Sequence, residues 1–337
     1  MKKALITGIS GQDGSYLAEY LLGLGYEVHG TLRRHSVAEN QDTRIQHLGN
    51  RVMTYYADMT DSHSVNYLVN TIKPDEIYSL AAQSHVQISF KMPGFTFQSN
   101  TMGVLNLLEA MKMYTPGAKL YHSGSSEMFG SSCDHDGFQR ETTHMTPVSP
   151  YGCSKLAACS LVKNYRKAYD LFAANGILFN HSSPRRGMNF VEQKIIYGAV
   201  AIKFGLANSL LLGNLESYRD FGHSKCYVRA MHAILQQDKP DEFVIATGQT
   251  RSVKEVCQFV FRELGLDYED YVGINPEFLR PQELPYLRGD STKARAELGW
   301  EPKYTAEALF KEMIEAAILN TEGNEASKHF LEITRRM

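Results

Sequence analysis

The fold is decided by residues 4–24, which read ALITGISGQDGSYLAEYLLGL. The apolar run at 4–7 is typical of a buried strand, and the spacing of apolar residues over 15–24 predicts a helix. Between them, Gly8, Gly11 and Gly14 form the pattern Gly-x-x-Gly-x-x-Gly on a strand-to-helix turn. This stretch therefore predicts the first strand, turn and helix of a βαβ unit.

The same alternation of short apolar runs and longer amphipathic segments continues to about residue 180. The expected strands are 4–7, 27–32, 52–57, 76–81, 119–123 and 172–179. Helical periodicity fills the gaps between them. Right-handed crossovers then give an α/β, Rossmann-type, doubly wound parallel sheet, with its ligand beyond the carboxyl ends of the strands.

After residue 180 the alternation gives way to loops rich in Arg, Asn and Gly, with one more strand at 242–246 and a helix beginning near Val253. We expect residues 1–180 to form the nucleotide-binding domain, with a strand and helix returning to it near 226–262. Residues 181–225 and 263–337 are expected to form a smaller, interleaved lobe that covers the substrate.

Composition excludes several classes of protein. The 35 basic and 37 acidic residues give a net charge of −2, so nothing favours a nucleic acid or a membrane surface as partner. The five cysteines form no C-x-x-C pair, which disfavours a disulfide framework or zinc site and favours a reducing cytoplasm. The scattered histidines predict no metal site.

The glycine turn predicts a dinucleotide site. Backbone N–H groups at a helix N-terminus bind pyrophosphate, so Gly8, Gly11, Gln12, Asp13 and Gly14 are expected to hold the cofactor.

The ends of the next strands refine this site. The second strand ends in Arg33 and Arg34, where an acid would bind a ribose 2′-hydroxyl, so a 2′-phosphate and hence NADP is favoured over NAD. Asp58 and Met59 are expected to flank the adenine. The small residues that follow the fourth strand are expected to lie against the cofactor: Leu80, Ala81, Ala82 and Ser84.

Residues 149–155, SPYGCSK, predict the start of a helix, with Ser149 as its cap and Pro150 in its first turn. Tyr151 and Lys155 then share one face at i, i+4. We expect the ammonium to lower the pKa of the phenol toward neutrality, so that Tyr151 takes a proton from a sugar hydroxyl.

The fifth strand is followed by Ser125 and Glu127. Ser125 is expected to hydrogen-bond the hydroxyl that Tyr151 deprotonates. Oxidation or reduction of a carbinol needs no carboxylate, whereas removal of a proton next to a ketone with loss of a vicinal hydroxyl does. Glu127 therefore favours a dehydratase over a simple dehydrogenase.

With these residues in view, the chain resembles the GDP-mannose 4,6-dehydratases of the extended short-chain dehydrogenase/reductase family over nearly its whole length. The further matching stretches are 80–86 (LAAQSHV), 180–181 (NH), 183–187 (SPRRG), 212–215 (LGNL), 219–220 (RD), 280–283 (RPQE) and 298–300 (LGW).

The resemblance implies an NADP-dependent hydro-lyase with catalytic Ser125, Glu127, Tyr151 and Lys155. It implies that His181 and Arg186 complete the cofactor site, together with Lys155. It also implies GDP-sugar ligands at Ser84, Asn180, Lys194, Gly213, Arg219, Arg280 and Glu283. The implied cycle oxidises C4, eliminates water across C5 and C6 and returns hydride to C6, with a tightly bound, recycled cofactor. A homotetramer, a dimer of dimers, is also implied, in which the run from Arg33 to Arg44 reaches a neighbouring subunit near the cofactor.

Several positions depart from the family pattern. Ser182 replaces a glutamate, Glu192 and Gln193 replace Thr-Arg, Cys226 replaces an aspartate, and Phe95 stands where a tyrosine is common. Exchange of a cation for neutral Gln193, with acidic Glu192 beside it, leaves a related GDP-sugar such as a GDP-manno-heptose as an alternative substrate.

Two other functions remain open. An epimerase or 4-ketoreductase of the same fold would not need Glu127. A redox sensor would bind NADP without turnover, and the presence of both Tyr151 and Lys155 argues against it.

Overall fold

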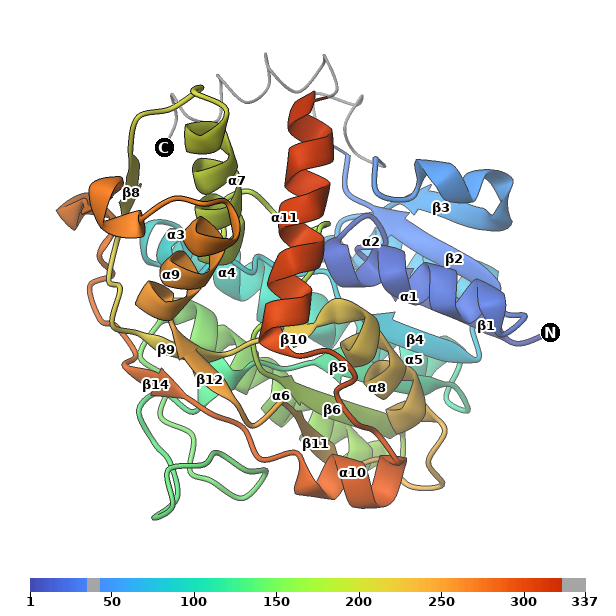
Figure 1. Ribbon diagram of the computed structural model, residues 1–337. Helices are drawn as coiled ribbons and strands as arrows, with labels where there is room; N and C mark the ends of the chain where they lie inside the picture. The colour runs from blue at the N-terminus through green and yellow to red at the C-terminus, as the bar shows by residue number, and fades with distance from the viewer. Residues whose placement is uncertain (35–42, 323–337) are drawn as a thin grey trace.

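The centre of the molecule is a seven-stranded parallel sheet (Figure 1). The computed structural model describes residues 1–34 and 43–322. Across the sheet the strands are β3 (Val52–Tyr56), β2 (Glu27–Leu32), β1 (Lys3–Thr7), β4 (Glu76–Ser79), β5 (Lys119–Ser123), β6 (Phe172–Leu178) and β11 (Glu242–Ile245). All six neighbouring pairs are parallel. The expected doubly wound Rossmann-type sheet is confirmed, and the order of its strands reverses between β1 and β4.

The expected strands differ from the observed ones by at most two residues at an end. The largest difference is at β4, which ends at Ser79. Beyond it the N–H groups of Leu80 and Ala81 both donate to Thr7 Oγ1, each at 3.0 Å, which turns the chain out of the sheet. The side chain of Thr7 thus fixes the point at which β4 opens toward the ligand side.

Helices cover both faces of the sheet. One face carries α1 (Gln12–Gly23) and α8 (Ser224–Leu235), and the other carries α2 (Ser62–Ile72), α5 (Gly103–Tyr114) and α6 (Pro150–Tyr169). Alternate strand residues point to opposite faces, so Ile6 packs against the first group of helices and Leu5 against the second. Both faces are therefore apolar, as a parallel sheet requires.

A smaller lobe stands over the carboxyl ends of the strands. Its core joins α7 (Val191–Lys203), α9 (Val253–Glu263) and α11 (Ala306–Glu322). Ser252 and Glu255 form a capping box at the start of α9, the helix expected near Val253. Because its apolar face packs on α7 and α11, α9 belongs to this lobe, whereas residues 226–262 as a whole were expected to return to the sheet.

Near the C-terminal end of the described chain, part of the segment that was expected to form the smaller lobe packs on the sheet instead. Helix α10 (Thr292–Leu298) lies against α8 and β11, and Ala294 and Trp300 are part of the core on the α1–α8 face. The indole N–H of Trp300 donates to the carbonyl of Cys226 at 2.8 Å. Part of 263–337 therefore packs on the sheet, and the two units are more interleaved than expected.

Short elements make the connections. They are η1 (Gln46–Arg51), α3 (Val86–Lys91), α4 (Pro93–Phe97), η2 (Gln98–Met102), η3 (Ser126–Met128), β7 (His181–Ser182), β8 (Leu210–Leu212), β9 (Tyr218–Asp220), β10 (Gly222–His223), β12 (Thr250–Ser252), η4 (Tyr268–Asp270), β13 (Val272–Ile274), η5 (Pro276–Phe278) and β14 (Tyr286–Leu287). Strands β7 and β10 pair where the chain leaves the sheet and returns to it. No helix in the described part of the chain could cross a membrane.

A loop after β5 ties the two units together. Gln139 exchanges backbone hydrogen bonds with Arg288 and Asp290, at 2.9 and 3.0 Å. Arg140 makes ion pairs at 2.8 Å with Asp134 in its own loop and with Asp290. Residues 288–290 are thereby held against the loop that follows β5.

The close approach of α1 to the first turn predicts a measurable stability difference. A Cβ on Gly14 would lie 2.4 Å from the carbonyl oxygen of Gly8, which is backbone and cannot yield easily. We expect Gly14→Ala to lower the free energy of unfolding by about 2 kcal/mol, because the overlap outweighs the better helix propensity of alanine.

Gly23 in the same helix is the matched control, since nothing lies within 4 Å of a Cβ there. Gly23→Ala should raise the free energy of unfolding by about 0.5–1 kcal/mol. Urea unfolding of both variants measures the difference. Equal stability of the two variants would show that the contact between Gly14 and the turn is not tight.

Candidate active site

A cavity of about 550 Å³ lies between the carboxyl ends of the strands and the smaller lobe. This volume is typical of a small-molecule site. Of the residues singled out from the sequence, it is lined by Gly8, Gly11, Gln12, Asp13, Gly14, Leu80, Ala81, Ala82, Ser84, Ser125, Glu127, Tyr151, Lys155, Asn180, His181, Arg186, Lys194, Gly213, Arg219, Arg280 and Glu283. Segments up to 275 residues apart in sequence therefore meet in one place.

The turn after β1 forms an anion cradle. Helix α1 has Gly11 at its N-cap without any side-chain cap, so the first N–H groups of the helix lack side-chain acceptors and face the cavity. Gly8 has a φ of 72°, and a Cβ on it would lie 3.1 Å from the Cα of Ala81. The bare backbone and the helix dipole fit the pyrophosphate of a dinucleotide.

Asp13 and His181 join this cradle to β7. The Nε2 atom of His181 lies 2.7 Å from Asp13, and its Nδ1 atom lies 2.8 Å from the carbonyl oxygen of Phe179. Burial would raise the pKa of Asp13, but His181 and Arg186 outweigh it and lower that pKa. Both ring nitrogens of His181 thus have oxygen partners, and the ring stacks on Tyr227 with 4.3 Å between the ring centres.

Three residues expected to hold the cofactor do not border the cavity. Arg33 is exposed, with its guanidinium 5.6 Å from the centre of the Phe95 ring. The carboxylate of Asp58 accepts from the N–H and hydroxyl of Thr60, and Met59 is buried. These residues lie beyond the ends of β2 and β3. Of the run from Arg33 to Arg44, residues 35–42 lie outside the described part of the chain.

Arg44 is a cation that the sequence did not single out. It lines the cavity, donating to the carbonyl of Arg185 at 2.8 Å and to that of Ser10 at 3.3 Å. It therefore lies beside the glycine turn, where a phosphate would bind. No sequence signal marks it, because it comes after a stretch without periodicity.

Helix α6 begins as expected. Ser149 accepts from the N–H of Gly152 at 3.0 Å, and Pro150 occupies the first turn. A Cβ on Gly152 would lie 2.7 Å from the carbonyl oxygen of Glu127, so the helix packs directly on η3. This contact brings Tyr151 and Glu127 to the same wall of the cavity.

The expected effect of Lys155 on Tyr151 is not what the structure has. The Lys155 ammonium donates to the carbonyl oxygen of Ser123 at 2.8 Å and lies 6.0 Å from the centre of the Tyr151 ring. Burial raises the pKa of Tyr151 to about 12, with a hydrogen bond to Ser125 opposing it and the charge of Glu127 adding to it. Burial also lowers the pKa of Lys155 to about 8. The prediction of a lowered phenol pKa is therefore wrong for the protein alone, because desolvation exceeds the effect of the ammonium.

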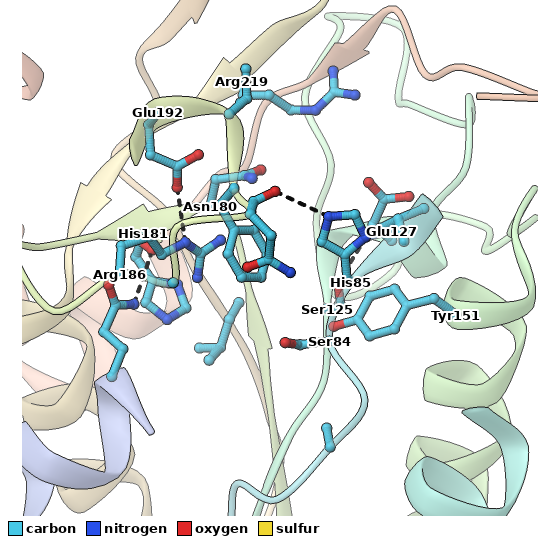
Figure 2. Close-up of a pocket in the computed structure, with 18 of the residues that line it drawn as sticks. Ser84, His85, Ser125, Glu127, Tyr151, Asn180, His181, Arg186, Glu192 and Arg219 are labelled. Atoms are coloured by element: carbon cyan, nitrogen blue, oxygen red, sulfur yellow. Dashed lines mark hydrogen bonds and ion pairs between the residues drawn. The ribbon is translucent and has the colours of Figure 1, made fainter. Parts of the chain in front are cut away.

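Glu127 is only 8% exposed and faces into the cavity. Figure 2 shows it on the same side as Ser84, Ser125 and Tyr151, across from Asn180, His181 and Arg186. Its Oε1 atom lies 3.5 Å from Nη1 of Arg280, which comes from the other lobe. The carboxylate thus shares the pocket with the phenol and is paired within the site.

The lobe side of the cavity concentrates positive charge. Arg219, with its side chain 7% exposed, pairs with Glu283 at 3.1 Å, and Arg280 lies 3.4 Å from the same oxygen. The Lys194 ammonium lies 4.6 Å from the centre of the Phe278 ring. Burial lowers the pKa of Lys194 and of Arg219. The three cations, Lys194, Arg219 and Arg280, outnumber the two acids of this part of the cavity, Glu127 and Glu283. This excess of positive charge suits a diphosphate.

Two of the departures from the family pattern, Ser182 and Glu192, contact each other, and the third, Gln193, lies outside the cavity lining. Glu192 is 2% exposed and accepts from Ser182 at 2.8 Å and from Arg186 at 3.0 Å. Arg186 also stacks on Phe190 at 3.6 Å. Gln193 is buried and does not line the cavity. The acid at 192 therefore neutralises Arg186, and the neutral Gln193 lies away from any ligand.

Other lining residues had no sequence argument behind them. They include His85, Gln87, Arg185, Asn189, Phe190, Asn214, Ser217 and Phe278. The side chain of His85 reaches the carbonyl of Asn189 at 3.1 Å across the cavity. Only the stretches LAAQSHV, SPRRG and LGNL marked any of them, through His85, Arg185 and Asn214. Among the described residues, no group of three His, Cys, Asp or Glu side chains could hold a metal ion.

Comparison with known proteins agrees with this geometry. Residues 5–313 match the family model described as GDP-mannose 4,6 dehydratase. GDP-mannose 4,6 dehydratase 2 of Arabidopsis thaliana is 49% identical over 93% of this chain and 86% of its own length. The human GDP-mannose 4,6 dehydratase is 44% identical over 94% of this chain and 91% of its own length.

Similarity of fold extends further than similarity of sequence. The UDP-glucose 4-epimerase of Thermotoga maritima, solved with UDP-glucose, has a TM-score of 0.83 at 24% identity, over 95% of this chain and 100% of the other. At that identity the likeness shows the fold alone, which epimerases and dehydratases share. The family model and the two dehydratases cover almost the whole sequence, and the chain belongs to the GDP-mannose 4,6 dehydratase family.

Proposed function

We propose that the chain is an NADP-dependent hydro-lyase that converts GDP-mannose to GDP-4-keto-6-deoxymannose. One observation carries the proposal: Glu127 and Tyr151 line the same cavity as the cations of the other lobe. The names of the Arabidopsis and human relatives support the substrate.

The residues of the cradle fit NADP. The glycine turn and the N-terminus of α1 would hold the pyrophosphate, with Arg44 beside it. Arg33 would reach the 2′-phosphate from the end of β2. NADP bound there would supply the redox chemistry, namely acceptance of a hydride from C4 of the sugar and its return to C6.

The protein's own groups then handle the protons. Tyr151, hydrogen-bonded to Ser125, would accept the proton of the C4 hydroxyl as a phenolate, the form that the positive charges of Lys155 and of bound NADP favour. Oxidation at C4 makes the C5 proton acidic, and Glu127 would remove it and pass it to the C6 hydroxyl, which leaves as water. The proton that Tyr151 took balances the one that C5 regains as hydride returns to C6. Lys155, held on the carbonyl of Ser123, positions a buried positive charge behind the phenol. Arg219, Arg280 and Lys194 would hold the diphosphate.

Two finer points belong to this proposal. A homotetramer is carried over from the family resemblance, and size-exclusion chromatography with light scattering measures it. A cytoplasmic location is supported by the five cysteines, all of which are free thiols.

Replacement of Glu127 by Gln should separate oxidation from elimination. The amide keeps the shape of the side chain but accepts no proton, so we expect turnover to fall by about 10²–10⁴-fold. Loss of one water from GDP-mannose, followed by mass spectrometry without added reductant, measures it. Reduced nicotinamide should accumulate to at most one equivalent per site.

The controls distinguish the alternatives. Glu216, on the exposed side of the loop after β8, gives a surface Glu→Gln variant that should keep normal turnover. An epimerase or ketoreductase would keep its activity in Glu127→Gln. If the wild type dehydrates GDP-manno-heptose and not GDP-mannose, the substrate is the heptose. If it dehydrates neither sugar nucleotide, the proposal is contradicted.

The buried ammonium of Lys155 predicts a pH dependence of stability. Below about pH 8 the folded and unfolded chains both carry this proton, and the folded chain bears the cost of burying it. As the pH rises from about 8 to 10.5 the folded chain loses the proton first, so the cost disappears. We expect the cofactor-free wild type to gain about 3 kcal/mol relative to Lys155→Met over this range.

Urea unfolding of both proteins at several pH values measures this difference, and the comparison cancels the other titrating groups. Lys163→Met on the exposed side of the same helix is the control, for which no such pH dependence is expected. A constant difference between wild type and Lys155→Met would show that the ammonium is well solvated.

The Arg33 guanidinium predicts cofactor selectivity. Loss of a charge-assisted contact to a 2′-phosphate should weaken NADP binding about 10–100-fold in Arg33→Ala and leave NAD binding unchanged. Arg51→Ala is the control, because Arg51 precedes β3 at the amino end of the strands, whereas Arg33 follows β2 at their carboxyl end. Titration with both cofactors by fluorescence measures the ratio. Equal weakening for NAD and NADP would mean that Arg33 does not read the phosphate.

A further inference from the structure

The catalytic carboxylate and the substrate-binding arginines form one continuous chain of charges. Glu127 Oε1 lies 3.5 Å from Arg280 Nη1, and the same nitrogen lies 3.4 Å from Glu283 Oε1. Glu283 Oε1 also lies 3.1 Å from Arg219 Nη2. In the protein alone, each acid is therefore neutralised by a cation that the substrate would use.

We propose that the substrate's diphosphate frees the base: on binding, it draws Arg280 away from Glu127, so that the carboxylate loses its counter-charge only when a nucleotide sugar is anchored. This inference rests on the proposed function. It makes Arg280 a positioning residue for Glu127 as well as a ligand of the diphosphate.

The geometry of Arg280 suits such an exchange. Its contacts at 3.4 and 3.5 Å are longer than the 2.7–2.9 Å typical of a charge-assisted hydrogen bond, and one nitrogen serves both acids. Its side chain is 28% exposed, so it has room to move. Arg219, by contrast, is fixed by donation to the carbonyls of Leu284 and Tyr218 at 2.8 and 2.9 Å. Arg280 is therefore the mobile member of the pair.

Electrostatics favour the same direction. A diphosphate presents more negative charge than one carboxylate and pairs of oxygens that match a guanidinium. Glu127 is buried, so loss of the ion pair with Arg280 leaves its negative charge less stabilised. Such a carboxylate is a stronger base toward the C5 proton of the sugar.

Other charged groups face Glu127 and stay in place during this exchange. Tyr151 from α6 and Arg219 from β9 both interact with its charge, and His85, before α3, lines the same cavity. Glu283 loses part of its pairing at the same time and becomes free to accept from ribose hydroxyls. Arg280 is therefore the one cation that moves in this exchange, and it lies between Glu127 and Glu283.

Binding of GDP to the protein saturated with NADP tests this inference without any turnover. Isothermal titration in two buffers of different ionisation enthalpy, at mildly acidic pH, measures protons taken up on binding. We expect the wild type to take up more protons than Glu127→Gln, because the phosphates of GDP and Glu283 are common to both proteins and only the wild type has the Glu127 carboxylate. We also expect Glu127→Gln to bind GDP about fivefold more tightly, because Arg280 no longer has to leave a charged partner.

A double-mutant cycle assigns the effect to the pair. In the Arg280→Gln background, the change Glu127→Gln should alter GDP affinity less than twofold. Glu192→Gln is the matched control, since Glu192 is a buried acid of the same cavity that pairs with Arg186. It should leave the proton uptake intact.

Unchanged GDP affinity in Glu127→Gln, or tightening that persists without Arg280, would overturn the inference while leaving the proposed function in place. Conversely, coupling with GDP but no dehydration of GDP-mannose would contradict the proposed function alone. A wild type that does not bind GDP would contradict both.

Discussion

The packing of α1 against the ends of β1 and β4 is the constraint on which the rest depends. Gly14 lies so close to the carbonyl of Gly8 that no side chain fits between them, and Gly8 meets the backbone of Ala81 in the same way. Thr7 takes the N–H groups of Leu80 and Ala81 and so turns β4 outward at this point. The sheet therefore opens between β1 and β4, and helix N–H groups face the gap. Every other group of the site is arranged around this opening.

The opposite wall depends on a second close contact, between Gly152 and the backbone of Glu127. It places a phenol, an ammonium and a carboxylate in a region with little water, where each is nearly covered. Lys155 has a carbonyl oxygen as its partner and Tyr151 has a hydroxyl. Such groups are held at a cost in stability, which is expected of a site arranged for chemistry. A bound cofactor and sugar supply the charges that the protein alone lacks.

Sequence alone predicted what short-range geometry determines. The glycine turn and the Ser149 cap each require only neighbouring residues, so their patterns predict their structures. The i, i+4 spacing correctly put Tyr151 and Lys155 on one face but could not say that Ser123 would take the ammonium. Arg44 and Phe278 were missed because loops without periodicity bring them to the cavity. Helix α9 was expected to return to the sheet. Its periodicity shows that it has an apolar face, but it cannot show which part of the chain that face packs against.

The two lobes contribute different groups to the site, and the fold alone does not determine which groups these are. The sheet side contributes the cradle, the phenol and the base, and an epimerase with a similar fold aligns over nearly the whole chain. The proposed elimination depends on the carboxylate at η3, and a carboxylate buried there needs a counter-charge in the absence of substrate. That charge comes from Arg280, after η5 in the other lobe. The loop at Gln139 and Arg140 also joins the chain after β5 to Arg288 and Asp290, a few residues beyond Arg280. In the proposed mechanism the reactivity of Glu127 therefore depends on how the two lobes are joined as well as on its own position.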